Sequence, residues 1–217
     1  MVTVVILALV SVFLALRLYA VLGKRTGHEQ QPLPRPAEER LGPPPAAGTV
    51  TDISPEARVL GDPSIGPAAQ RGLKAIMAAD SAFDPARFLE GAKYAYRMVL
   101  EAYWSGDEAQ LAELAGDDVR AAFFQAIADR KAAGHVLDNR LVAVERAMIS
   151  DAELDGQMAR ITVRFDADIA AVTRDGDGNV IAGSLSDAVP THDVWTFSRH
   201  IRSDDPNWLL VETDEAA

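Results

Sequence analysis

The pattern of apolar and polar residues divides the chain into three parts. Val2 to Leu22 form an almost unbroken apolar run, no regular periodicity follows for about 40 residues, and a helical and then a strand-like periodicity begin after that. Because periodic apolar positions build a buried face, the pattern predicts an anchor at 1–25, a linker at 26–67 and one folded domain at 68–217.

The apolar run has the length of a membrane-spanning helix. Its 21 residues contain one charge, Arg17. They would extend about 31 Å at 1.5 Å per residue, close to the roughly 30 Å hydrocarbon core of a bilayer. A cleaved signal peptide is the alternative, but no basic residue precedes the run and no small-x-small cleavage site follows it. We therefore expect one uncleaved transmembrane helix.

Basic residues at the end of the run orient the predicted anchor. Arg17 lies near the end of the span, where its long side chain can reach the headgroups, and Lys24 and Arg25 follow. By the positive-inside rule, these three residues form the cytoplasmic flank of the anchor. The expected topology is single-pass, with the C-terminal domain in the cytoplasm.

The segment after the anchor reads as a spacer. Nine of the twelve prolines lie between Pro32 and Pro67, and apolar periodicity is missing there. Such a segment cannot bury enough surface to offset the entropy of ordering it. A flexible chain of about 40 residues spans roughly 35 Å root-mean-square. A Pro-rich ligand for a small adaptor domain is the alternative, but the motif is of low specificity.

Four helices are predicted after the linker. They cover 68–80, 85–104, a short segment from 108 to 114, and a final segment that Gly134 closes. Asp84, Asp107 and Asp117 are the expected N-caps, and Pro85 fits the first helical position.

The apolar period then changes from about 3.6 to two. Strands are predicted at 141–149, 161–169, 193–201 and 207–213. Asp155-Gly156 and the segment 175–178 are typical of the turns between strands. Helices followed by antiparallel strands predict an α+β domain, in which the apolar face of the sheet packs on the helices.

Charge and composition exclude several classes of function. Residues 75–217 hold 13 Lys and Arg against 26 Asp and Glu, a net charge of −13. A domain this acidic is unsuited to binding nucleic acid and is repelled by anionic lipid. The chain has no cysteine, which excludes a disulfide framework, a thiolate metal site and a cysteine nucleophile.

No motif predicts a metal, a cofactor or a catalytic residue. The stretch from Asp175 to Asn179 begins like a calcium loop, but Val180 and Ser186 occupy positions that require Gly and Glu. The four histidines, His28, His135, His192 and His200, are not paired at zinc-binding spacing. We therefore expect a protein that is not an enzyme.

Arg199 is the polar residue that stands out in the strand region. It shares strand parity with Trp195 and Phe197, so its side chain should face the core or a pocket. One interpretation is an arginine at the rim of the core, paired with a carboxylate. The other is a contact to a ligand or partner inside a concave sheet.

Several segments resemble a known family. They are Phe83-Asp84-Pro85-Ala86-Arg87-Phe88-Leu89-Glu90-Gly91-Ala92, Ala102-Tyr103-Trp104-Ser105-Gly106-Asp107, Asp193-Val194-Trp195-Thr196-Phe197-Ser198-Arg199 and Asp205-Pro206-Asn207-Trp208-Leu209-Leu210-Val211. In order and spacing they resemble the Tim44-like domain, in particular the membrane-anchored, TimA-type adaptors of alphaproteobacteria. The resemblance covers roughly residues 68 to 215.

The resemblance implies a cone like that of nuclear transport factor two, in which a curved antiparallel sheet wraps helices around an apolar pocket. Residues that could line it are Tyr96, Phe165, Trp195, Phe197 and Arg199. The mitochondrial member of the family binds cardiolipin-rich membrane and tethers a seventy-kilodalton heat-shock chaperone to the translocation channel. It also has a long N-terminal region that contacts chaperone and channel, where this chain has only the Pro-rich linker, and it lacks the transmembrane helix.

The expected function is that of a non-enzymatic adaptor in a bacterial inner membrane. It would bind a membrane or chaperone protein, or lipid, with a link to protein transport. A tethered cone domain that binds a small molecule or acts on it is the alternative. A third hypothesis is direct association of the helix at 68–80 with lipid.

Overall fold

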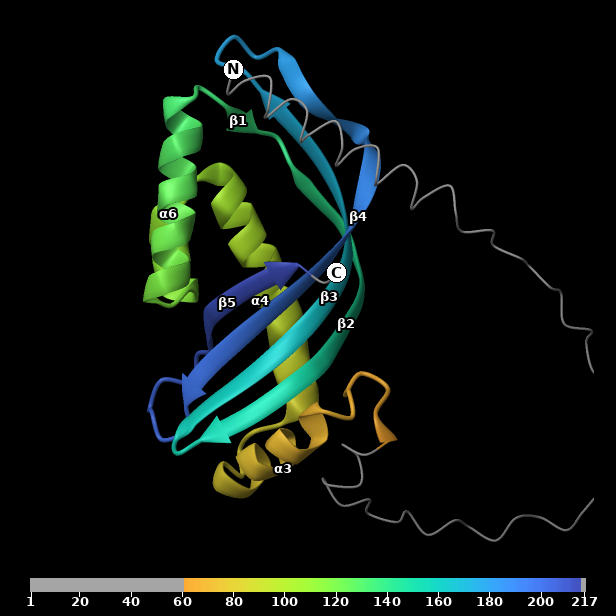
Figure 1. Ribbon diagram of the computed structural model, residues 1–217, viewed down its shortest axis with the longest axis vertical. Helices are drawn as coiled ribbons and strands as arrows, with labels where there is room; N and C mark the ends of the chain where they lie inside the picture. The colour runs from red at the N-terminus through yellow and green to blue at the C-terminus, as the bar shows by residue number, and fades with distance from the viewer. Residues whose placement is uncertain (1–60, 216–217) are drawn as a thin grey trace, which may run out of the picture. The chain divides into compact units, whose positions relative to one another are not determined.

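A computed structural model describes residues 61–215 (Figure 1). The helices are α3 (Ala69–Ala79), α4 (Pro85–Ser105), α5 (Glu108–Leu114) and α6 (Asp117–Ala132). The strands are β1 (Val136–Leu137), β2 (Arg140–Asp155), β3 (Met158–Arg174), β4 (Val180–His200) and β5 (Leu209–Glu215). Helices therefore precede strands, and the predicted α+β organisation is confirmed.

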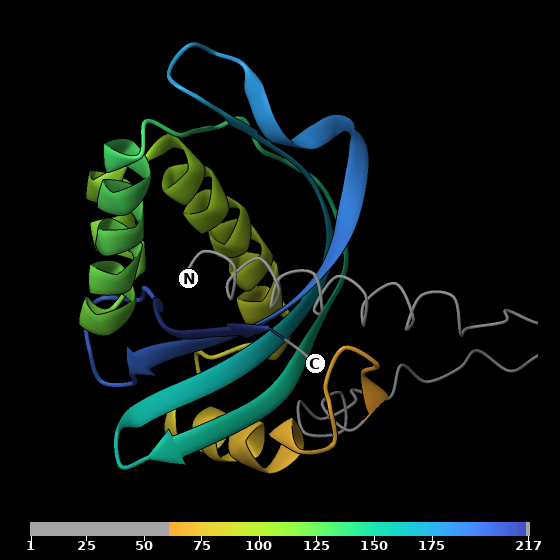
Figure 2. The same ribbon diagram turned by 45° about the horizontal axis from the view of Figure 1, so that its top comes forward.

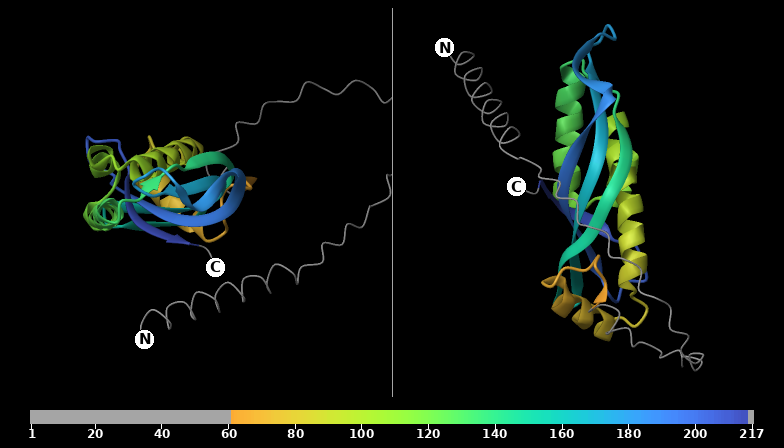
Figure 3. Two further views of the ribbon diagram at one scale, coloured as in Figure 1. Left: turned by 90° about the horizontal axis from the view of Figure 1, so that it is seen from above. Right: turned by 90° about the vertical axis from the view of Figure 1, so that its right-hand side faces the viewer.

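The strands form one curved antiparallel sheet. Its order is β1-β3-β4-β5, and β2 also pairs with β3. Figure 2 shows the sheet bending around α4 and α6, which lie on its concave side. The side view in Figure 3 places α3 at the end of the domain where β2 and β3 form their hairpin. The core lies between α4 and the concave face, because the apolar positions of both turn toward each other.

The helix boundaries follow the local signals in the sequence. Asp84 caps α4 by accepting a hydrogen bond from the Arg87 amide at 2.9 Å, and Asp107 caps α5 in the same way. The prediction for α6 was wrong at its start, because Gly116 occupies the N-cap position and Asp117 is the first helical residue. The Asp117 carboxylate instead pairs with Arg120 at 2.7 Å, one turn further along.

The strands are longer than the periodicity indicated. The segment predicted at 141–149 is part of β2, which extends to Asp155. The segment predicted at 193–201 is, apart from Ile201, part of β4, which begins at Val180 and ends at His200. Register shifts interrupt the pairing of β2 with β3 and of β3 with β4. In β2 a bulge moves the apolar positions to the other parity, so a strict period of two is lost although the strand continues. In β4 the first half of the strand is exposed on both faces, so it carries no alternation of buried and exposed positions.

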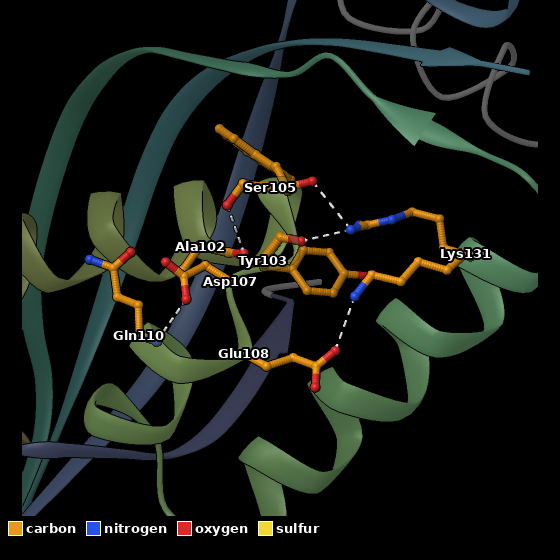
Figure 4. Close-up of polar contacts among 9 residues, drawn as sticks. Ala102, Tyr103, Ser105, Asp107, Glu108, Gln110 and Lys131 are labelled. Atoms are coloured by element: carbon orange, nitrogen blue, oxygen red, sulfur yellow. Dashed lines mark hydrogen bonds and ion pairs between the residues drawn. The ribbon is translucent and has the colours of Figure 1, made fainter. Parts of the chain in front are cut away.

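Polar contacts at the end of α4 hold it against α5 and α6 (Figure 4). Gly106 ends α4 in the left-handed conformation, with φ +75°. The Arg130 guanidinium of α6 donates hydrogen bonds to the carbonyls of Tyr103 and Trp104 at 3.0 and 3.2 Å. A cation at this position satisfies carbonyls that have no partner within the helix and complements the negative end of its dipole.

The packed chain begins before Ala68. Ile65 is buried, and the Ile149 amide donates a hydrogen bond to the Ser64 carbonyl at 2.8 Å. The Gly66 amide in turn donates to the Ile149 carbonyl at 2.7 Å. This short bridge covers part of the outer edge of β2, which would otherwise expose unpaired backbone groups.

Tyr96 lies at the centre of the core with its hydroxyl in a polar contact. The ring stacks on Phe165, with centroids 4.4 Å apart, and lies 4.6 Å from Trp195. Its hydroxyl donates a hydrogen bond to Asp193 at 2.5 Å. Burial raises the pKa of Tyr96 well above its usual value, and the Asp193 carboxylate raises it further.

This raised pKa predicts a loss of stability at alkaline pH. The contribution of the Tyr96 hydroxyl is fully present below the unfolded-state pKa of about 10 and declines as pH rises above it, by at most about 1.4 kcal/mol per pH unit. We expect the difference in unfolding free energy between the wild type and Tyr96→Phe to be constant from pH 7 to 9 and to shrink above pH 10. Urea unfolding of the full chain in detergent measures it. A difference independent of pH would contradict the prediction.

Candidate functional site

A groove of about 600 Å³ lies along α4 from Arg87 to Met98. Its walls are the loop between α3 and α4, the end of α5, the end of β4 and the segment that leads into β5. It is lined by Asp80, Ala82, Phe83, Asp84, Arg87, Phe88, Gly91, Ala92, Tyr94, Ala95, Met98, Glu113, Leu114, Phe197, Arg199, Pro206, Asn207 and Trp208. Parts of the chain more than 100 residues apart thus form one site.

Aromatic side chains form one end of the groove. Phe83, Phe88 and Trp208 contact one another, with ring centroids 4.8 to 6.0 Å apart. Phe88 also meets Phe197 edge to face at 6.1 Å. Phe83 and Trp208 are only half-buried, so this end of the groove presents aromatic surface to the solvent. Such surface is typical of sites that bind apolar ligands or partner side chains.

Arg199 closes the same end. Its guanidinium forms an ion pair with Asp80, and both side chains are 15% exposed. The guanidinium carbon lies 5.2 Å from the centroid of the Trp208 ring. Asp80 also accepts a hydrogen bond from the Ala82 amide at 3.0 Å. The pair therefore fixes the loop between α3 and α4 against β4. The first interpretation of Arg199, as an arginine paired with a carboxylate at the rim of the core, is confirmed.

The other end of the groove follows one face of α4. Gly91, Ala95 and Met98 lie on this face, and the nearby Tyr94 is 66% exposed. A Cβ atom added to Gly91 would meet nothing within 4 Å. The wall here is therefore low and open, in contrast to the aromatic end.

A second hollow of about 590 Å³ continues from the groove toward α3. The two share Ala82, Phe83, Asp84 and Arg87, and the second also includes Asp62 and Ile65. The Ser64 hydroxyl and amide both donate to the Asp62 carboxylate, and these hydrogen bonds lower the pKa of Asp62. The start of the packed chain thus lies beside the continuation of the groove.

Of the five residues predicted to line a pocket, two line the groove and three lie in the core. Phe197 and Arg199 line the groove. Tyr96, Phe165 and Trp195 lie in the aromatic stack of the core and do not border the groove. The anchor flank of Arg17, Lys24 and Arg25 lies outside the described residues.

Several residues that line the groove were not predicted from the sequence to belong to a site. Phe83, Gly91 and Trp208 belong to the segments that carried the family resemblance, and this was the one signal that could have found them. Their meeting depends on the path of the loop between α3 and α4 and on the approach to β5, which no local periodicity predicts.

The polar chemistry of residues 61–215 is sparse. No group of three or more metal-ligating side chains gathers among them. His192 pairs with Asp166 at 2.7 Å on the surface, and this contact lowers the pKa of Asp166. Neighbouring Asp193 points to the other face, toward Tyr96, as expected for adjacent strand residues.

Between residues 61 and 215, no helix is both long and apolar enough to cross a membrane. The predicted transmembrane helix lies outside this range.

The fold and the groove define a class of protein: an α+β domain with helices in the concave face of an antiparallel sheet and a partly exposed aromatic groove. A Tim44-like domain matches residues 69–215, and the chain belongs to the Tim44-like domain family. No curated protein matches the chain. Among solved structures, the chain is similar to the intermembrane space region of the chloroplast protein ARC6. The two are 16% identical, 59% of this chain and 96% of that chain are covered, and the TM-score is 0.43.

Proposed function

We propose that this protein is a membrane-tethered, non-enzymatic adaptor that binds a segment of a protein partner in the groove along α4. In this proposal residues 1–25 cross a bacterial inner membrane, residues 26–67 form the spacer and the folded domain works in the cytoplasm. The observation that carries the proposal is the exposed apolar surface of the groove, where Phe83, Trp208 and Tyr94 are accessible. The Tim44-like family, with its TimA-type membrane adaptors, supports the same role.

Charge favours a protein partner over lipid. The net charge of −13 on residues 75–217 opposes approach to anionic headgroups. The apolar residues of α3 are not available for insertion either, because Leu73 and Ile76 are fully buried. We therefore do not retain the hypothesis that this helix binds lipid directly. A membrane protein or a chaperone linked to protein transport is the proposed class of partner.

The second candidate function is small-molecule binding, which the size of the groove supports. Its volume of about 600 Å³ lies within the range of ligand pockets, which is about 300 to 1,000 Å³. A bound metabolite would be seen by native mass spectrometry of the full chain released from detergent. A mass equal to that of the bare chain would argue for the adaptor.

The adaptor proposal is tested by in-cell crosslinking of the full-length protein in its native membrane, followed by mass spectrometry. We expect one membrane or chaperone protein to be crosslinked reproducibly. Tyr94→Glu should reduce that yield at least tenfold, since it places a charge in the groove. Val136→Glu is the matched control, because Val136 is similarly exposed but lies outside the groove. Crosslinks only to the protein itself would refute the proposal.

A further inference from the structure

Gly91 has no structural role that explains a glycine at its position. Two glycines, Gly72 and Gly91, lie inside the helices α3 and α4. A Cβ atom at Gly72 would lie 1.7 Å from the Ala152 carbonyl oxygen, so the packing of α3 requires glycine there. A Cβ atom at Gly91 would meet nothing. Because glycine weakens a helix relative to alanine, the packing of this domain gives no reason for its presence in α4.

The place of Gly91 in the groove supplies a reason. It lies where the open end of the groove meets the aromatic end, three residues after Phe88, and its missing side chain leaves the backbone of α4 directly accessible. Small residues at such positions let the backbone of another helix approach closely, so that its larger side chains reach the floor on either side. The groove runs beside α4 from Arg87 to Met98, about 16 Å at 1.5 Å per residue, which matches about three turns of a helix.

The charges at the two ends favour a helix over a lipid chain. Arg87 lies near the start of α4 and Glu113 near the end of α5, and neither forms an ion pair with the residues that the structure describes. The Asp84 carboxylate also lines the groove beside Arg87, where it is engaged as the N-cap of α4 and accepts from the Arg87 amide. A helix whose N-terminus lies near Glu113 and whose C-terminus lies near Arg87 complements both charges through its dipole. This direction is antiparallel to α4. A hydrocarbon chain has no group that complements Glu113.

We propose that the occupant of the groove is an apolar helix of the partner protein, which crosses α4 at Gly91 and runs antiparallel to it. This inference rests on the proposed adaptor function and adds the form and direction of the bound segment. Large apolar side chains of the partner would contact Phe83 and Trp208 at one end and Met98 and Leu114 at the other.

The test uses a photoreactive benzoylphenylalanine at Tyr94 or at Arg87 of the full-length chain in its native membrane. These positions are exposed and seven residues apart on α4, about 10.5 Å along the helix. Against a bound helix, the crosslinked residues of the partner should also be about seven apart. Against an extended strand they should be about three apart, at 3.3 Å per residue. The partner residue crosslinked from position 87 should lie C-terminal to the one crosslinked from position 94.

A matched pair of variants tests the role of Gly91. Gly91→Leu should lower the yield of photocrosslinks from benzoylphenylalanine at position 94 at least tenfold, because the leucine side chain fills the point of closest approach. Ala121→Leu adds an exposed leucine to α6 outside the groove and should leave the yield unchanged. Far-UV circular dichroism verifies that both variants fold.

The possible outcomes separate this inference from the adaptor proposal. Spacing of three residues, the reverse order, adducts with lipid alone, no adducts, or an unchanged yield in Gly91→Leu would each overturn the bound antiparallel helix. If general in-cell crosslinking still identifies a partner in such a case, the adaptor proposal stands and the partner binds elsewhere or in another form. If neither experiment identifies a protein partner, both fail.

Discussion

Gly72→Ala is expected to destabilise the domain by at least about 3 kcal/mol, although it adds a single methyl group. The new Cβ atom would lie 1.7 Å from the Ala152 carbonyl oxygen and 2.2 Å from its carbon, both backbone atoms of β2. Backbone cannot rotate away as a side chain can, so α3 must move off the sheet and expose Leu73 and Ile76. A cost of this size exceeds the range for most single substitutions. For a domain of this length, the melting temperature should fall by roughly 6–12 °C.

Thermal unfolding of the full chain in detergent, followed by circular dichroism, measures this effect. Gly91→Ala is the matched control, because it makes the same chemical change inside a helix where the added Cβ has open space. We expect that control to be neutral or to stabilise the domain by up to about 1 kcal/mol, from the higher helix propensity of alanine. Equal melting temperatures for the two variants would show that α3 does not approach β2 as closely as described.

The sequence predicted the elements whose signals are local. Asp84 and Asp107 cap helices because a carboxylate next to the first turn accepts a free amide, and the neighbouring residues are sufficient for this. The alternation from Ile161 to Phe165 identified β3 because one face of that strand is buried along its length. The N-cap of α6 was predicted wrongly as Asp117, because acidic residues are also favoured within the first turn of a helix. The N-cap is the preceding residue, Gly116.

The groove could be predicted only in part. Strand parity correctly placed Trp195, Phe197 and Arg199 toward the helices, but parity does not show how far along the strand the core ends and the groove begins. That limit is set by tertiary contacts, such as the stacking of Trp195 against Tyr96. The partner of Arg199 was also beyond reach, because Asp80 lies 119 residues earlier in the sequence.

Breaking the ion pair of Arg199 and Asp80 is the second change with a large expected effect. Arg199→Met should destabilise the domain by about 3 kcal/mol, because it leaves the mostly buried Asp80 carboxylate without its cation. Asp80→Asn should cost a similar amount, since it leaves the arginine without an ion-pair partner. The side-chain oxygen of the new asparagine can still accept the hydrogen bond from the Ala82 amide. Urea unfolding of the full chain in detergent gives these free energies.

A double-mutant cycle separates the pair from its surroundings. The double variant Asp80→Asn with Arg199→Met should be less destabilised than the sum of the two single variants, by about 2 kcal/mol, because neither charge is then left alone. The exposed pair of Lys93 and Glu90 is the control, and Glu90→Gln should cost less than about 0.5 kcal/mol. Additive effects at Arg199 and Asp80 would mean that the two side chains act independently. The loop between α3 and α4 would then be held by its aromatic contacts, chiefly those of Phe83 with Phe88 and Trp208.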